Sequence, residues 1–327
     1  MLKSASLLTL LLVGCGSGGP PPMESTPDGG SSSQGDSGPS AQSDGGADPL
    51  GDAGASEDAG TTTFAISPDC VQGGAGVTYN GWTMVITNDF VAAKNGDVIV
   101  AIAYSLSIDD GLRAADHLAE GVWDRLIGDE YTAGPRTSGG DGFGLIAYSS
   151  GPATENATGA SVFIAVSVER HNGTALPVIA VAPDEATLRA LLPTPESVAE
   201  MRRYNAFPLR CATLGGRWTS SSVDAYNTYD VFGFFTGLVV SALRFDASFD
   251  SATHYTFRAK VTTNTGSQNE VDEGTYAATD TTIHLTSSAG FRDKTYDASF
   301  VGVRGGIALY IVDEQFSGDA WLLLRAP

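Results

Sequence analysis

Hydrophobic and polar positions divide the chain into four stretches. An apolar run stands at the N-terminus, a polar stretch follows to residue 62, and the rest alternates short apolar runs with turn residues. Up to about residue 210 these runs mix strand and helix spacing, whereas beyond it they have strand character throughout. We therefore predict a signal peptide at 1–14, a linker at 15–62, and folded domains at 63–210 and 211–327.

Segment 63–210 carries five runs typical of β-strands. Each is rich in β-branched or aromatic residues and is bounded by Gly, Asn, Asp or Pro. Between the last two, Asn172-Gly173 is a favoured type I′ hairpin dipeptide, which predicts that His171 lies in a turn. The five runs span residues 82–86, 97–104, 142–148, 162–168 and 175–181.

Three helices are predicted in the same segment. Apolar residues recur at helical spacing over 112–126, with Asp109 or Asp110 as the N-cap. A second pattern spans 183–193, and a third starts after Pro195. Antiparallel strands with helices on one or both faces predict an α+β sandwich, that is, an antiparallel sheet with flanking helices.

Four features follow one another between residues 64 and 204. Gly81-Trp82 opens a strand pair, Trp123-Asp124-Arg125-Leu126 lies in a helix, two glycines at 142 and 144 precede a strand, and a helix closes the segment. This order resembles the PsbP-type extrinsic proteins and bacterial lipoproteins of that fold. The resemblance is one of pattern. It implies a binding or assembly module and brings no catalytic residues.

Segment 211–327 is a series of short strands separated by turn signals. No helix pattern interrupts them, which predicts an all-β antiparallel barrel or half-barrel. After the opening Gly216-Arg217-Trp218-Thr219, the strands span 237–245, 254–261, 274–278, 283–286, 298–303, 307–312 and 321–324.

Gly216-x-Trp218 on the first of these strands and Arg325 after the last resemble the lipocalin pattern. In that family the Trp closes the barrel floor and a late Arg lies across its ring, an arrangement that cation–π attraction stabilises. The later lipocalin motifs are not visible, so the resemblance implies a smaller lipocalin-like barrel. Trp218 and Arg325 are a candidate barrel-closing pair; simple packing at a barrel end is the other interpretation.

The N-terminal run is typical of a secretory signal. Lys3 precedes apolar residues 7–13, a stretch well short of the roughly 20 residues of a membrane-spanning helix. Leu12-Val13-Gly14-Cys15 resembles the bacterial lipobox, which implies a lipoprotein held in the membrane by acyl chains on Cys15. In that family an aspartate after the cysteine retains the protein in the inner membrane. Gly16 stands in place of that aspartate and therefore indicates the outer membrane. The periplasmic face and the cell-surface face of that membrane are both left as alternatives.

Composition and charge limit the kinds of molecule that we expect the protein to bind. Residues 16–62 are mainly Gly, Ser, Pro, Ala and Asp without Lys or Arg, so we expect a disordered acidic linker. The whole chain has 18 Lys and Arg against 38 Asp and Glu, a formal net charge of −20. A phosphate backbone would be repelled, which argues against nucleic acid as a partner.

Cysteine usage suggests one covalent link. With Cys15 acylated, Cys70 and Cys211 are the remaining pair in an oxidising compartment. They are candidates for a disulfide between the two folded segments, and two buried thiols are the alternative.

No motif for catalysis, a metal or a cofactor stands out, so we assign no such residues. The four histidines, at 117, 171, 254 and 284, are not spaced as the ligands of a metal motif are. His254 and His284 could still meet across adjacent strands. One aromatic cluster could line an apolar pocket, with ordinary core as the alternative. Its members are Tyr226, Tyr229, Phe232, Phe234 and Phe235.

Two function classes remain. The favoured one is a non-catalytic binding module of the cell envelope that meets an envelope protein, a glycan or a small apolar ligand. A carrier of a small apolar ligand through the lipocalin-like domain is one form of it. The other class is an enzyme whose residues come together only in three dimensions.

We expect lipidation to depend on Cys15. Intact-mass analysis of the protein isolated from membranes should show added acyl mass on the wild type and none on a Cys15→Ala variant, because the thiol is the acceptor. A wild type that carries no acyl mass would refute the lipobox assignment.

Overall fold

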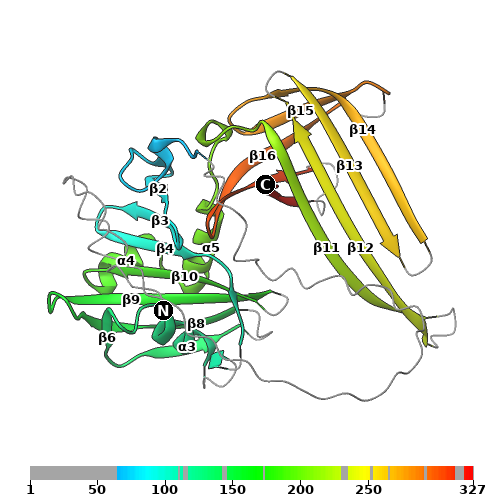
Figure 1. The fold of residues 1–327 in the computed structure, drawn as a ribbon. Helices are drawn as coiled ribbons and strands as arrows, with labels where there is room; N and C mark the ends of the chain where they lie inside the picture. The colour runs from blue at the N-terminus through cyan, green and yellow to red at the C-terminus, as the bar shows by residue number, and fades with distance from the viewer. Residues whose placement is uncertain are drawn as a thin grey trace, which may run out of the picture.

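The computed structural model describes residues 65–109, 111–112, 117–141, 146–171, 174–229, 235–250, 253–263, 266–290, 293–313 and 320–326. They form a mostly β protein in which an N-terminal sheet is followed by a closed antiparallel barrel (Figure 1). The predicted signal peptide, Cys15 and the linker lie outside the described residues. None of the described helices has the length and apolar character needed to cross a membrane.

The N-terminal sheet has ten strands, and every pairing within it is antiparallel. Its strands are β1 (Val77–Tyr79), β2 (Trp82–Ile86), β3 (Phe90–Asn95), β4 (Val98–Ala103), β5 (Leu106–Ser107), β6 (Tyr131–Ala133), β7 (Thr137–Gly140), β8 (Ile146–Glu155), β9 (Ser161–His171) and β10 (Thr174–Ala182). Eight of them lie in the order β1-β2-β3-β4-β10-β9-β8-β6, while β5 pairs with β10 and β7 with β8.

Three short α-helices are described on this sheet: α3 (Leu118–Leu126), α4 (Glu185–Leu191) and α5 (Pro195–Glu200). Val122 of α3 packs in one apolar cluster with Ile164, whereas Leu188 of α4 and Val198 of α5 pack in another with Phe163. Neighbouring residues of β9 face opposite ways, so the helices lie on both faces of the sheet. The prediction of an antiparallel sheet with flanking helices is therefore confirmed in part: the domain is mostly β, and its helices are short.

Local chemistry explains where the two later helices begin. The Asp184 side chain accepts a hydrogen bond from the Thr187 amide at 2.8 Å and caps α4. Thr194 and Ser197 form a reciprocal capping box at α5, and a proline occupies the first turn. Proline 193 cannot continue α4, so the chain starts a new helix.

Tight turns set the register of the hairpins. Asn80 and Gly81 both have positive φ, 49° and 81°, and join β1 to β2 as a type I′ turn requires. The predicted hairpin at 172–173 falls outside the described residues, but His171 lies opposite Thr174. His171 therefore ends β9 and is the residue directly before the predicted turn.

The barrel is closed, which confirms the all-β prediction and rules out the half-barrel. Its strands are β11 (Gly216–Tyr229), β12 (Phe235–Phe249), β13 (His254–Thr263), β14 (Gly266–Ala278), β15 (Thr282–Ser287), β16 (Asp293–Val303), β17 (Gly306–Val312) and β18 (Ala320–Arg325). Each pairs with the next, and β18 returns to β11 through Trp218↔Arg325 and Thr219↔Leu324.

Strands β11 to β14 are longer than the turn pattern predicted and extend past the closed part of the barrel (Figure 1). Beyond Thr219, β11 pairs with β12 alone among the described residues, and β14 before Gly274 pairs with β13 alone. Residues 266–271 of β14 are all exposed and mostly polar. Because these side chains are hydrated on both faces, the sheet can extend here without an apolar core beneath it.

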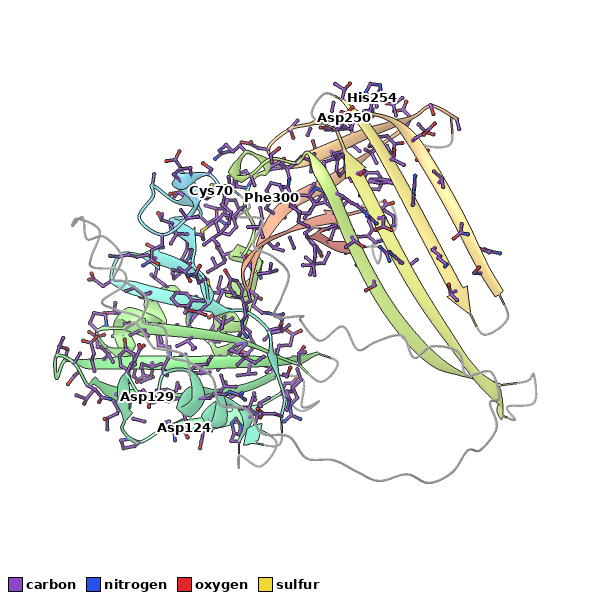
Figure 2. All side chains as sticks on the ribbon, viewed as in Figure 1. Cys70, Asp124, Asp129, Asp250, His254 and Phe300 are labelled. Carbon is purple, nitrogen blue, oxygen red and sulfur yellow. A yellow bond between two sulfur atoms is a disulfide. The ribbon has the colours of Figure 1, made fainter. Side chains whose placement is uncertain are left out.

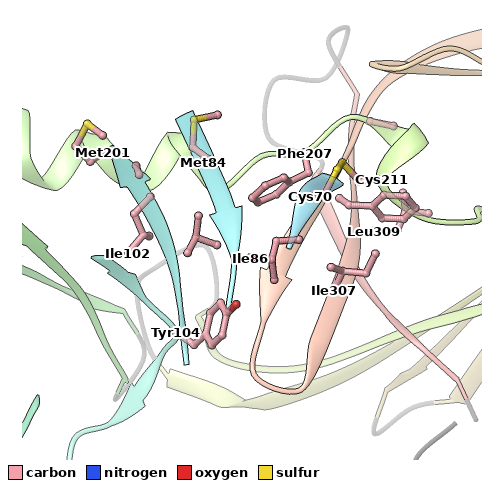
Figure 3. Close-up of a cluster of buried hydrophobic side chains, with 14 of the residues drawn as sticks. Cys70, Met84, Ile86, Ile102, Tyr104, Met201, Phe207, Cys211, Ile307 and Leu309 are labelled. Atoms are coloured by element: carbon pink, nitrogen blue, oxygen red, sulfur yellow. A yellow bond between two sulfur atoms is a disulfide. The ribbon is translucent and has the colours of Figure 1, made fainter. Parts of the chain in front are cut away.

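Sheet and barrel share one apolar core (Figure 3). Three 3-10 turns border it, η1 (Pro68–Cys70), η2 (Met201–Tyr204) and η3 (Leu209–Cys211). Phe207, between η2 and η3, forms a β-bridge with Phe300 of β16, and their two backbone hydrogen bonds measure 2.7 and 2.8 Å. The Asn205 side chain also holds Gly302: its Nδ2 donates to the Gly302 carbonyl at 2.9 Å, and its Oδ1 accepts from the Gly302 N–H at 2.7 Å.

A disulfide joins Cys70 to Cys211 across the same region, with an S–S distance of 2.07 Å and a sequence separation of 141. Both cysteines are buried in the shared core. The Ser67 amide bonds the Cys211 carbonyl at 2.6 Å, so the start of the described chain is also held at the start of the barrel.

Removing the disulfide should destabilise the whole protein. We expect a Cys70→Ser/Cys211→Ser variant to lose about 4–5 kcal/mol of unfolding free energy on the chain-entropy model for a loop of this length. Urea denaturation followed by tryptophan fluorescence measures the loss, and reducing the wild type should reproduce it. An unchanged denaturation midpoint after reduction would contradict this expectation.

Candidate functional site

An open pocket of about 350 Å³ lies where the sheet meets the barrel. We call it the seam pocket, and its walls come from three parts of the chain. The sheet supplies 77–79 and Met84, the connecting segment supplies residues between 203 and 210, and the barrel supplies Asp280, Thr281 and Ser299. Neither half alone would form it.

Aromatic side chains make the apolar wall of the seam pocket. The ring centroid of Tyr204 lies 5.9 Å from that of Tyr79 and 6.2 Å from that of Trp82, both in tilted geometry. Tyr79 is 61% exposed although it belongs to this cluster, whereas Met84 and Phe207 are buried. An exposed ring beside a buried apolar floor is a surface that an apolar or aromatic ligand can cover.

Charged groups stand at the rim of the seam pocket. Arg210 forms an ion pair with Asp280 on the turn between β14 and β15, and the Leu209 amide bonds the Asp280 carbonyl at 2.8 Å. These contacts tie the connecting segment to the barrel. Arg203 is paired with Glu200 and is exposed, so it lies within reach of a polar group on a bound molecule. The arrangement suits binding through an apolar body with one polar end.

The sheet side of the same region holds a buried phenol. The Tyr104 hydroxyl donates to the Thr87 carbonyl at 2.7 Å. Burial, followed by the charge of Asp89, raises the pKa of Tyr104 well above its usual value, so the hydroxyl stays protonated at any physiological pH. An added Cβ on Gly302 would lie 3.0 Å from this oxygen and 2.8 Å from Val91, which shows how closely barrel and sheet approach.

The structure brings Trp218 and Arg325 together at the closure of the barrel. The guanidinium carbon of Arg325 lies 5.5 Å from the Trp218 ring centroid, and its Nη2 donates to the Gly215 carbonyl at 3.0 Å. Trp218 is fully buried, donates to the Leu214 carbonyl at 2.8 Å and stacks on Phe300. The pair thus connects barrel closure to the shared core.

Aromatic rings occupy the closed part of the barrel. The Phe245 ring lies 5.2 Å from Phe257 and 5.7 Å from Trp321, and Phe249 lies 5.1 Å from Tyr276. These contacts do not test the predicted aromatic pocket, because its members lie outside what the structure describes. That holds for the side chains of Tyr226, Tyr229 and Phe235 and for the whole of Phe232 and Phe234.

A buried carboxylate inside the barrel was missed by sequence reasoning. Asp272 is 5% exposed and accepts hydrogen bonds from the Tyr255 hydroxyl at 3.0 Å and from the Ser287 hydroxyl at 2.6 Å. Two hydroxyl donors compensate for the loss of water around this group. The three residues are far apart in sequence, so only the register of β13, β14 and β15 reveals the cluster.

The histidines do not assemble into a site. β14 lies between the strands that carry His254 and His284, so the expectation that they meet across adjacent strands is wrong. His254 lies 3.4 Å from Asp250 at the end of the barrel far from the sheet, in the open (Figure 2). Among the described residues, no group of three or more His, Cys, Asp or Glu could hold a metal ion.

His284 has the neighbours of a catalytic histidine but not the surroundings. Its Nε2 lies 3.0 Å from Asp293, and its Nδ1 lies 2.9 Å from the Thr295 hydroxyl. The His284 and Asp293 side chains are 44% and 78% exposed on the outer surface of the barrel. Water there screens the charges and hydrates the hydroxyl, so the arrangement lacks the enclosed setting in which such groups catalyse.

We expect the Arg325→Gln substitution to weaken barrel closure. Loss of the ring contact and of the guanidinium hydrogen bond should lower the unfolding free energy by about 1–3 kcal/mol. Arg304→Gln is the matched control, because Arg304 is an exposed cation in the turn between β16 and β17. Equal thermal midpoints for the two variants would show that the Trp218–Arg325 contact contributes nothing.

Comparisons with protein-family models, curated proteins and solved structures found no match to this chain.

Proposed function

We propose that the protein is a non-catalytic binding module of the bacterial cell envelope, anchored in the outer membrane by acyl chains on Cys15. In this proposal, 63–210 is a PsbP-like domain, 211–327 is a lipocalin-like domain, and the acidic linker holds both away from the lipid surface. The sequence from Leu12 to Cys15 supports the anchor. The closed barrel with its Trp218–Arg325 contact supports the lipocalin-like assignment.

The ligand of this module is a small apolar or aromatic molecule, and its site is the seam pocket. The single observation that carries this proposal is the exposed Tyr79 ring beside buried Met84 and Phe207 in a pocket of about 350 Å³. That volume lies within the usual range for small-molecule sites. The walls need no large rearrangement to receive a ligand, because the disulfide and the Phe207–Phe300 bridge hold them in place.

Transport of an apolar ligand inside the barrel is the weaker form of the proposal. The closed part of the barrel is occupied by its own rings, including Phe245, Phe257 and Trp321. A ligand there would have to displace packed side chains, whereas the seam pocket is already open. An envelope protein that inserts an aromatic side chain into the pocket is a third occupant, and nucleic acid is not expected.

Filling the pocket should abolish binding. The probe is 1-anilinonaphthalene-8-sulfonate, an aromatic molecule with one anionic end, whose fluorescence rises in apolar surroundings. We expect Ser299→Phe, which adds a ring inside the pocket, to weaken probe binding about tenfold or more, a change of about 1.4 kcal/mol in binding free energy. The Cys15→Ala full-length chain avoids added acyl groups.

Thr286→Phe is the matched control, because Thr286 is an exposed strand residue of the barrel that does not line the pocket. Native mass spectrometry after incubation with an envelope extract then identifies the retained molecule. A molecule lost from Ser299→Phe and kept by Thr286→Phe supports the proposal. Equal retention by both variants, or no retention by the wild type, would overturn it.

A further inference from the structure

Basic side chains gather on the outer surface of β11, β12 and β13. The register places Asp246 opposite Arg258 and Arg244 opposite Lys260, with Arg217 diagonal to Asp246. Residues directly opposite, and those two apart along a strand, share one face of a sheet. Four of the chain's 18 Lys and Arg residues therefore surround one carboxylate. We call these five residues the basic patch.

Asp246 orients two of the cations. Its carboxylate accepts from Arg217 Nη2 at 3.2 Å and from Arg244 Nε at 3.0 Å. Burial acts to raise the pKa of Asp246, but hydrogen bonds from Arg244, Thr219 and Arg217 outweigh it and hold the pKa below its usual value. The carboxylate stays charged and neutralises only one of the four cations, so the basic patch keeps a formal charge of +3.

The other two cations are available. Arg258 and Lys260 form no ion pair with any carboxylate that the structure describes. Arg258 lines a recess of about 290 Å³ together with Arg217, Asp246, Ala247, Ser248 and Thr256. The two guanidinium groups offer only donors to a ligand, the two hydroxyls can donate or accept, and the Asp246 carboxylate is already occupied by Arg217 and Arg244.

We propose that the basic patch binds a phosphate group carried by a small polar molecule. Guanidinium groups present parallel N–H donors that match the oxygens of phosphate, and a local charge of +3 suits a doubly charged phosphate monoester better than a single carboxylate. The recess also has room for part of the molecule that carries the phosphate, where Ser248 and Thr256 contact its hydroxyl groups.

The acidic character of the whole chain restricts what can bind. A net charge of −20 repels an extended polyanion, whereas a small anion responds mainly to the nearest charges within a Debye length of about 8–10 Å. Glu273 of β14 lies opposite Thr256 on the same face of the sheet. Its negative charge limits the positively charged area to β11, β12 and β13. This site lies on the barrel wall and does not share a lining residue with the seam pocket, so it stands independently of the proposed function.

Calorimetric titration of the full-length Cys15→Ala chain tests this site. The probes are inorganic phosphate, glucose 1-phosphate and unphosphorylated glucose. We expect both phosphates to bind and glucose not to, with affinity falling as salt is added. Tighter binding of glucose 1-phosphate identifies a sugar phosphate as the ligand type, and equal affinity identifies free phosphate.

The decisive variant is Arg258→Gln/Lys260→Gln. It breaks no described ion pair, so its thermal unfolding should match that of the wild type, while phosphate affinity should fall about tenfold or more. Arg304→Gln removes one exposed cation elsewhere and should bind as the wild type does. Undetectable binding of both phosphates to the wild type, or equal affinity in the double variant, would overturn the proposal.

Discussion

The apolar core that runs without a break from the sheet into the barrel is the contact on which the rest of the structure depends. Phe207 and Phe300 are fully buried at its centre, and their backbones pair directly. Burying each such ring stabilises the fold by roughly 1.5–3 kcal/mol. Because this core joins both halves, the seam pocket has fixed walls and the disulfide closes a loop whose ends already lie together.

The two proposed sites use opposite physical features of the same barrel. The seam pocket is apolar and lies on the side that meets the sheet, whereas the basic patch is polar and lies on outward positions of β11 to β13. The barrel contributes Ser299 of β16 and residues 280–281 to the seam pocket, and β11 to β13 to the basic patch. Along β12, alternation places buried Ala247 beside outward Asp246, which carries charge. One strand therefore supports packing and recognition together.

Part of the fold could be predicted because it rests on local patterns. Strand β2 was predicted at its observed bounds, and α5 begins at Pro195, where the third helix was predicted to start. Strand β3 was missed, since Ala92, Ala93 and Lys94 have weak strand propensity and are held by pairing on both sides. The long strands of the barrel were predicted too short, because polar residues in β14 look like turns when read alone.

The sequence by itself determined the strand-rich character and named Cys70 and Cys211 as the candidate pair, and it is the whole basis of the proposed anchor at Cys15 and the proposed compartment, because charge, hydrophobic period and cysteine count are properties of the sequence alone. Tertiary structure alone decided the seam pocket, the Tyr255–Asp272–Ser287 cluster and the basic patch. Each joins residues from strands or segments distant in the chain, and their neighbours depend on strand register and on how two surfaces dock. A shift of one residue in register would turn every one of these side chains to the other face.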